Sequence, residues 1–132
     1  MIKVLDSHAL MSYLEKEPGY DKVAGHFVES VNRNENLLMT SVNLGEVLYI
    51  VLRECGPQKA NEVEKIISSL PIEIVDVDLT LAKEAAKIKA FHKIAYADCF
   101  AAALTKMHRG ELITGNREFK LLENTIKIAW IS

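Results

Sequence analysis

Five polar residues stand at points where chemistry can be organised. Asp6, Thr114 and Asn116 follow predicted strands, while Glu46 and Asp98 lie in the first turns of predicted helices. Ligands of open α/β sheets bind beyond the carboxyl ends of the strands, so we expect these side chains to converge at one rim. Carboxylates are the ligands that hard cations such as Mg²⁺ or Mn²⁺ prefer. The set therefore predicts a cation held by Asp6, Glu46 and Asp98, and with it phosphodiester hydrolysis by an activated water.

Asp98 is the most informative single residue because it interrupts a mostly apolar stretch. Apolar residues dominate positions 94–97 and 99–104 on its two sides, and its own helix face carries Ala102 and Thr105. A carboxylate in such surroundings is costly unless a positive group pairs with it. No basic side chain shares this face, so a divalent cation is the partner that the sequence favours.

Asp6 and Glu46 each have a structural interpretation that the sequence leaves open. Asp6 can be the N-cap of the helix that follows it, although Ser7 can also fill that position. Glu46 can be an ordinary solvated helix residue, but its helix face includes the apolar Val42 and Ile50. For these two acids the metal-binding role depends on all three carboxylates meeting at one place.

Short apolar runs alternate with amphipathic segments along the whole chain. Strands are predicted at residues 2–5, 37–39, 72–77, 112–114 and 126–131. Helices are predicted at residues 7–18, 21–31, 58–70, 96–107 and 117–123, from Ser41 or Asn43 to residue 55, and from Asp78 or Thr80 through Ile88. No β-hairpin signal joins two strands. The alternation predicts an α/β sandwich with a central, mainly parallel sheet of four to five strands, forming one domain over residues 1–132.

Composition excludes several other classes of protein. The chain has 132 residues and a net charge of −2, which argues against holding nucleic acid by bulk charge. No apolar run approaches the ~20 residues of a membrane helix, and Asp6 interrupts any signal-peptide core, so we expect a cytoplasmic protein without membrane contact. The histidines and the two cysteines lack the spacing of a zinc site.

Four short motifs resemble, in order, those of the PIN-domain family, and specifically the VapC-type toxins of type II toxin–antitoxin pairs. Each motif alone is weakly specific, but their order, their spacing and the total length all fit, and the match spans the whole chain. The motifs lie at residues 4–10 (VLDSHAL), 40–47 (TSVNLGEV), 96–103 (YADCFAAA) and 112–119 (LITGNREF).

The resemblance implies a PIN-like three-layer α/β/α sandwich and an endoribonuclease dependent on Mg²⁺ or Mn²⁺. It implies that Asp6, Glu46 and Asp98 bind the metal, and that Thr114 orients them or a water. The family usually has a fourth acid where this chain has Asn116. An Asn carbonyl oxygen can still coordinate a cation, but with one charge less we expect a single firmly held ion.

The expected partners, all three implied by the resemblance, are an RNA substrate, a cognate antitoxin protein and a second copy of the chain in a homodimer. Ser7 and Arg117 are the expected substrate contacts, Arg117 because it adjoins Asn116 and can reach a phosphate. Most other basic residues of the second half are interpreted as solvated helix faces. The main alternative is a PIN-like binding module weakened in catalysis by Asn116. Phosphatase and receiver domains rank lower, because His8 stands where the phosphatase needs an acid and the approach to Asp6 is apolar.

Overall fold

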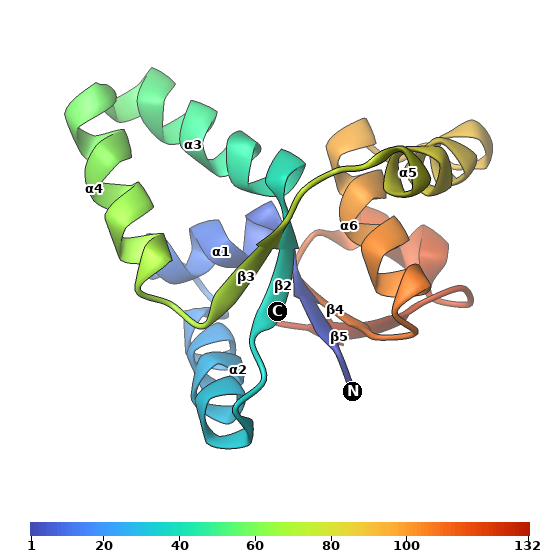
Figure 1. Cartoon of the computed structure of the whole chain (residues 1–132), viewed down its shortest axis with the longest axis horizontal. Coiled ribbons are helices and arrows are strands. Elements are labelled where there is room, and N and C mark those ends of the chain that lie inside the picture. The colour runs from blue at the N-terminus through green and yellow to red at the C-terminus, as the bar shows by residue number, and fades with distance from the viewer.

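A computed structural model describes all residues, 1–132, as five strands, six α-helices and one 3₁₀ helix (Figure 1). The strands are β1 (Lys3–Leu5), β2 (Leu37–Thr40), β3 (Ile72–Val75), β4 (Glu111–Thr114) and β5 (Lys127–Trp130). The helices are α1 (Ser7–Leu14), α2 (Tyr20–Arg33), α3 (Ser41–Cys55), α4 (Pro57–Ser68), α5 (Leu79–Phe91), α6 (Tyr96–Met107) and the 3₁₀ helix η1 (Arg117–Leu122). Every predicted strand and helix is present, with ends that differ by a few residues.

The five strands form one sheet in the order β3-β2-β1-β4-β5, and every neighbouring pair is parallel. β1 lies at the centre, where Val4 pairs with Leu38 on one side and Leu112 on the other. The predicted parallel sheet of four to five strands is confirmed. All five strands therefore point the same way, so their carboxyl ends share one edge, as the site prediction requires.

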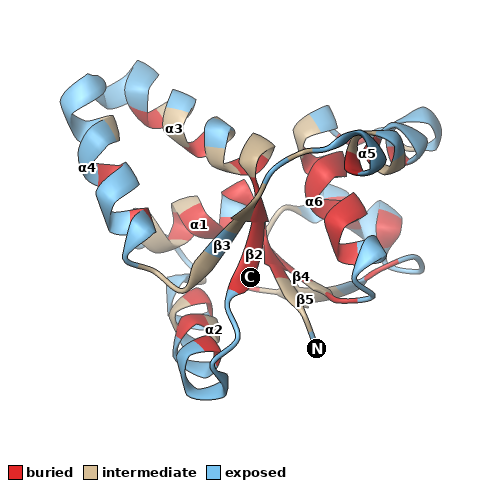
Figure 2. Cartoon of the chain, viewed as in Figure 1, coloured by how far each residue is buried: buried red, intermediate tan, exposed pale blue.

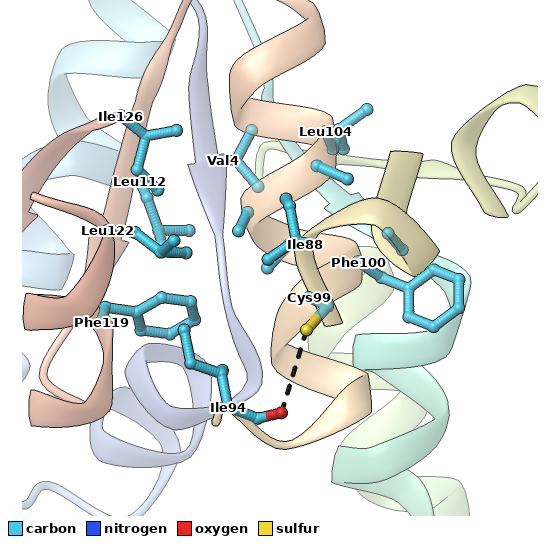
Figure 3. Packing of buried hydrophobic residues seen from close by; sticks show 14 of the residues in the cluster. Val4, Ile88, Ile94, Cys99, Phe100, Leu104, Leu112, Phe119, Leu122 and Ile126 are labelled. Atoms are coloured by element: carbon cyan, nitrogen blue, oxygen red, sulfur yellow. Dashed lines mark hydrogen bonds between the residues drawn. The ribbon is translucent and has the colours of Figure 1, made fainter. Parts of the chain in front are cut away.

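Helices cover both faces of the sheet and produce two hydrophobic cores (Figures 1 and 2). Neighbouring residues of a strand face opposite sides, so Leu5 and Ile113 pack against α1–α4 while Val4 and Leu112 pack against α5, α6 and η1. In the second core, the Phe119 ring of η1 lies beside the sheet residues (Figure 3). The three-layer α/β/α sandwich is confirmed, and the layers hold the strand ends in fixed positions. No helix is both long and apolar enough to cross a membrane.

Several helices begin directly at the ends of strands, with polar side chains as caps. The Asp6 carboxylate accepts a hydrogen bond from the Ala9 N–H, so Asp6 caps α1 and the alternative cap Ser7 is wrong. Thr40 caps α3, so the predicted caps Ser41 and Asn43 are both wrong. The reason is that β2 stays extended up to Thr40 and the chain then enters the helix without a loop. Asp78 caps α5, one of the two predicted positions. Strand ends and helix starts therefore coincide at the candidate site.

Candidate active site

An open cleft of about 280 Å³ lies at the carboxyl edge of the sheet, between α1, α3 and α6. Its lining residues are Ser7, His8, Met11, Ser12, Glu17, Glu46, Ile50, Asp98 and Asn116. Two of the three predicted metal-binding acids, Glu46 and Asp98, thus line one cleft, and Asp6 is close enough to both for their charges to raise its pKa. No Lys or Arg lines the cleft.

Asp6 is fully buried at the junction of β1 and α1. Its Oδ1 accepts the Ala9 N–H at 2.7 Å, and its Oδ2 accepts the hydroxyl of Thr114 at the end of β4. The Asp6 pKa is raised to about 7, mainly by burial and to a smaller extent by the charges of Asp98 and Glu46, while the two hydrogen bonds oppose the shift. Asp6 is therefore both the helix cap and a carboxylate without a positive partner.

Glu46 is held by its neighbours in the cleft. Its Oε1 accepts a hydrogen bond from the hydroxyl of Ser7, a residue that also lines the cleft. One turn earlier on α3, the buried Asn43 donates from Nδ2 to the Ala97 carbonyl at 3.1 Å. Because Ala97 precedes Asp98, this bond joins the start of α3 to the start of α6. Glu46 and Asp98 consequently face the same cleft.

Asp98 is only 7 % exposed, as its apolar sequence context predicts. Its pKa is raised to about 6, mainly by burial and also by the charges of Glu46 and Glu118, while a hydrogen bond from Asn116 opposes the shift. The ion pairs of the chain all lie elsewhere, and no Lys or Arg side chain pairs with Asp98. Two buried carboxylates that repel one another, with no cationic side chain, form a donor set that suits a divalent cation.

The side chains do not form a preassembled cage for an ion. No group of three or more His, Cys, Asp or Glu side chains is close enough together to hold a metal as arranged. Mg²⁺ commonly binds one or two carboxylates and keeps several waters, so a full protein cage is not required. The donor chemistry at Asp6, Glu46 and Asp98 therefore fits such an ion, with water completing its coordination.

Asn116 and Arg117 follow β4 but differ in where they point. Asn116 lines the cleft, its Nδ2 donates to Asp98 Oδ2 at 3.1 Å, and its Oδ1 accepts the Glu118 N–H at 3.1 Å. The Arg117 guanidinium lies over the Trp130 ring at 4.6 Å and donates to the Ser132 carbonyl. Arg117 is not among the residues that line the cleft. Its predicted contact with a phosphate would require it to leave these two partners.

His8 is a cleft residue that the motif analysis did not select. Its imidazole packs against Gly115, where a Cβ would lie only 2.7 Å from His8 Cε1. The sequence signal was available, since His8 lies in the first turn of the helix that Asp6 caps.

Comparison with known proteins places this geometry among related folds. The sequence matches the PIN domain family over residues 3–124. The structure is similar to VapBC2 from Rickettsia felis bound to a promoter DNA fragment, with TM-score 0.75 and 19% identity over 98% of each chain. It is also similar to DNA-bound VapBC from Salmonella typhimurium, with TM-score 0.76 and 20% identity over 100% of this chain and 99% of that one.

A third similar structure is VapC20 from Mycobacterium tuberculosis, described as a sarcin-ricin loop cleaving toxin. Its TM-score is 0.64 at 14% identity, over 90% of this chain and 93% of that one. A search among curated proteins found no match. At these identities, the structural likeness shows a common fold.

Proposed function

The chain belongs to the PIN-domain family, and from that premise we propose that it is a metal-dependent endoribonuclease, the toxin of a toxin–antitoxin pair. One observation carries the proposal. Asp6, Glu46 and Asp98 gather at the carboxyl edge of the sheet, and no Lys or Arg lines the adjoining cleft to neutralise them. Carboxylates that converge without a positive partner at a ligand-binding edge favour a hydrolase that uses a divalent ion.

Mg²⁺ or Mn²⁺ is the proposed cofactor, and Asp6, Glu46 and Asp98 are its proposed ligands. Such an ion, when bound, supplies an activated water and neutralises charge on the phosphate. The chain's own hydrogen bonds orient the ligands beforehand. The Thr114 hydroxyl and the Ala9 N–H hydrogen-bond to the two oxygens of Asp6, which supports the proposal that Thr114 orients this acid. Held ligands lose little freedom when the ion binds.

Ser7 is assigned the role of positioning Glu46, in addition to the predicted contact with substrate. Its hydroxyl donates to Glu46 Oε1, yet Ser7 also lines the cleft and is reachable from it. Substituting Ser7→Ala removes one hydrogen bond to a charged acceptor, which contributes about 1.5–3 kcal/mol when buried. We expect reduced cleavage of RNA with little change in fold. Unchanged cleavage by Ser7→Ala would contradict both roles.

A ribonuclease assay with and without Mg²⁺ or Mn²⁺ tests the proposed activity, with Asp98→Asn as the inactive variant. Asp78→Asn is a matched control because Asp78 is an exposed cap outside the cleft, and Asn caps helices as well as Asp does. Metal-ion catalysis contributes several kcal/mol, so we expect Asp98→Asn to lose about a hundredfold or more in rate while Asp78→Asn keeps it. Equal background cleavage by wild type and Asp98→Asn sinks the proposal.

The alternative is a binding module in which Asn116 has weakened catalysis. It differs from the nuclease in the same assay, because a module binds RNA without metal-dependent cleavage. The observation that favours it is that Asn116 brings an amide, and not a fourth carboxylate, to Asp98. The remaining acids and the held Asp6 favour the nuclease.

An antitoxin and a second copy of the chain are the proposed protein partners. The similar structures from Rickettsia felis and Salmonella typhimurium are VapBC complexes, which supports an antitoxin here. Tyr49 and Leu52 on α3 are about half exposed, at 52% and 50%, although their helix is buried at Val47 and Val51. Exposed apolar residues beside a buried stripe support a homodimer. Light scattering that finds only monomer at micromolar concentration would remove the dimer.

A further inference from the structure

A continuous set of hydrogen bonds links the two most buried acids of the cleft through Asn116. The Thr114 hydroxyl donates to Asp6 and accepts the Asn116 backbone N–H at 2.9 Å. The Asn116 side chain then donates to Asp98 at 3.1 Å. The backbone of Asn116 thus supports one acid through Thr114 and its side chain contacts the other, although Asp6 precedes α1 and Asp98 lies in α6.

The direction of the Asn116 amide is set by chemistry. A backbone N–H can only donate, so the Asn116 atom that faces the Glu118 N–H must be the oxygen. The amide nitrogen therefore faces Asp98 Oδ2. Rotating the amide to offer its oxygen to a cation would place the amide nitrogen against the Glu118 N–H, so that two donors would face each other. The same rotation would leave Asp98 without its hydrogen-bond donor. The structure thus disfavours the predicted coordination through the Asn116 carbonyl.

We propose that Asn116 is a positioning residue for Asp98 and that its amide restricts the cleft to one divalent cation. The inference rests on the proposed nuclease function. Asp98 Oδ2 is occupied by the amide, which leaves Oδ1 as the free oxygen for an ion. A second ion would have to displace this amide, and at that position it meets N–H hydrogens, which cannot coordinate a cation, in place of an oxygen ligand.

Asn116→Asp isolates this role because Asp keeps the cap acceptor toward the Glu118 N–H and replaces only the group that faces Asp98. Asn61→Asp is the matched control, since it adds the same charge at an exposed position of α4. In EDTA at pH 8, we expect Asn116→Asp to melt about 5 °C or more below Asn61→Asp, because a hydrogen bond to a carboxylate becomes a repulsion.

Titration calorimetry with Mn²⁺ alone gives the second measurement, which a merely structural role of Asn116 would not change. We expect the wild type and Asn61→Asp to bind one Mn²⁺ per chain. Asn116→Asp is expected to bind a second ion, or to bind the first about tenfold or more tightly, because of the added carboxylate. Saturating Mn²⁺ should also remove its deficit in melting temperature.

The outcomes separate this inference from the proposed function. Binding of two Mn²⁺ ions by the wild type overturns the one-ion restriction, even if RNA cleavage is intact. An Asn116→Asp variant that matches Asn61→Asp in both melting temperature and Mn²⁺ binding overturns the whole inference, again even if RNA cleavage is intact. A wild type that neither binds Mn²⁺ nor cleaves RNA overturns the nuclease and the one-ion restriction together. In that case a lower melting temperature of Asn116→Asp still supports the positioning of Asp98.

Discussion

Replacing Thr114 tests most directly whether hydrogen bonds inside the protein stabilise Asp6. Its fully buried hydroxyl donates to Asp6 Oδ2 and accepts the Asn116 N–H at 2.9 Å. Thr114→Val keeps the branched shape and deletes both bonds. A hydrogen bond to a charged group contributes about 1.5–3 kcal/mol, and an orphaned buried donor costs about 1–3 kcal/mol. Since neighbouring contributions are not additive, we expect a total loss of about 3 kcal/mol.

For a chain of this length, that loss lowers the melting temperature by about 10 °C. The assay is thermal and urea unfolding of metal-free protein in EDTA, followed by circular dichroism. Thr114→Ser is the control, because Ser keeps the hydroxyl and loses one methyl group, at a cost of about 1 kcal/mol. If Thr114→Val and Thr114→Ser unfold together, the hydroxyl does not stabilise Asp6 and the reasoning is refuted.

The difference between the two variants should also depend on pH. The Asp6 pKa is about 7, so Asp6 is protonated in the folded protein at pH 5 and charged at pH 8.5. The Thr114 bond lowers this pKa because it favours the charged form, so its loss is most costly where Asp6 is charged. The gap in unfolding free energy between Thr114→Val and Thr114→Ser should therefore widen from pH 5 to pH 8.5. A gap that narrows over this range would contradict the assignment.

Two further predictions concern stability alone. In metal-free wild type, the folded pKa values of Asp6 and Asp98, about 7 and about 6, exceed their unfolded values, so the folded state holds more protons between about pH 4 and pH 7. The free energy of unfolding should therefore fall as pH rises through that window, and urea titrations that show it rising would contradict these pKa shifts. Mg²⁺ should stabilise the protein more at pH 7.5 than at pH 5. Gly110→Ala places a Cβ 2.3 Å from the Ile2 carbonyl oxygen and should cost about 2 kcal/mol or more, because backbone must move. Gly25→Ala is its control, since nothing lies within 4 Å of that Cβ and Ala favours the interior of α2, so its melting temperature should rise slightly.

The sheet and the position of the cleft could be predicted because they depend on patterns that act over a few residues. Apolar runs followed by polar residues mark the ends of β1 and β4, and a parallel sheet places all such ends at one edge. The burial of Asp98 was predicted from its apolar neighbours and is confirmed by its 7 % exposure. These inferences need only local sequence and the general rules of α/β folds.

The direction of individual side chains could not be predicted in the same way. Arg117 adjoins Asn116 in sequence, but its guanidinium lies over Trp130, which β5 brings beside it only in the folded sheet. The Asn116 amide is oriented by the Glu118 N–H, which points at it only because η1 is a 3₁₀ helix capped by Asn116. Sequence neighbours show which residues are near a site, whereas hydrogen bonds made in the folded state decide what those residues offer to a ligand.

The charge of the cleft differs from what the net charge of the chain suggests. A net charge of −2 spreads over many exposed helix faces, yet the cleft itself collects Glu17, Glu46 and Asp98 with no Lys or Arg among its lining residues. In the proposed enzyme, an RNA phosphate brought to this cleft meets the carboxylates of Glu17, Glu46 and Asp98 with no Lys or Arg to offset them, so these acids repel the substrate. A divalent ion between the carboxylates and the phosphate reverses the sign of that interaction. In the proposed enzyme the same ion therefore has to admit the substrate as well as activate the water, and removing it should weaken binding of RNA at the cleft as well as its cleavage.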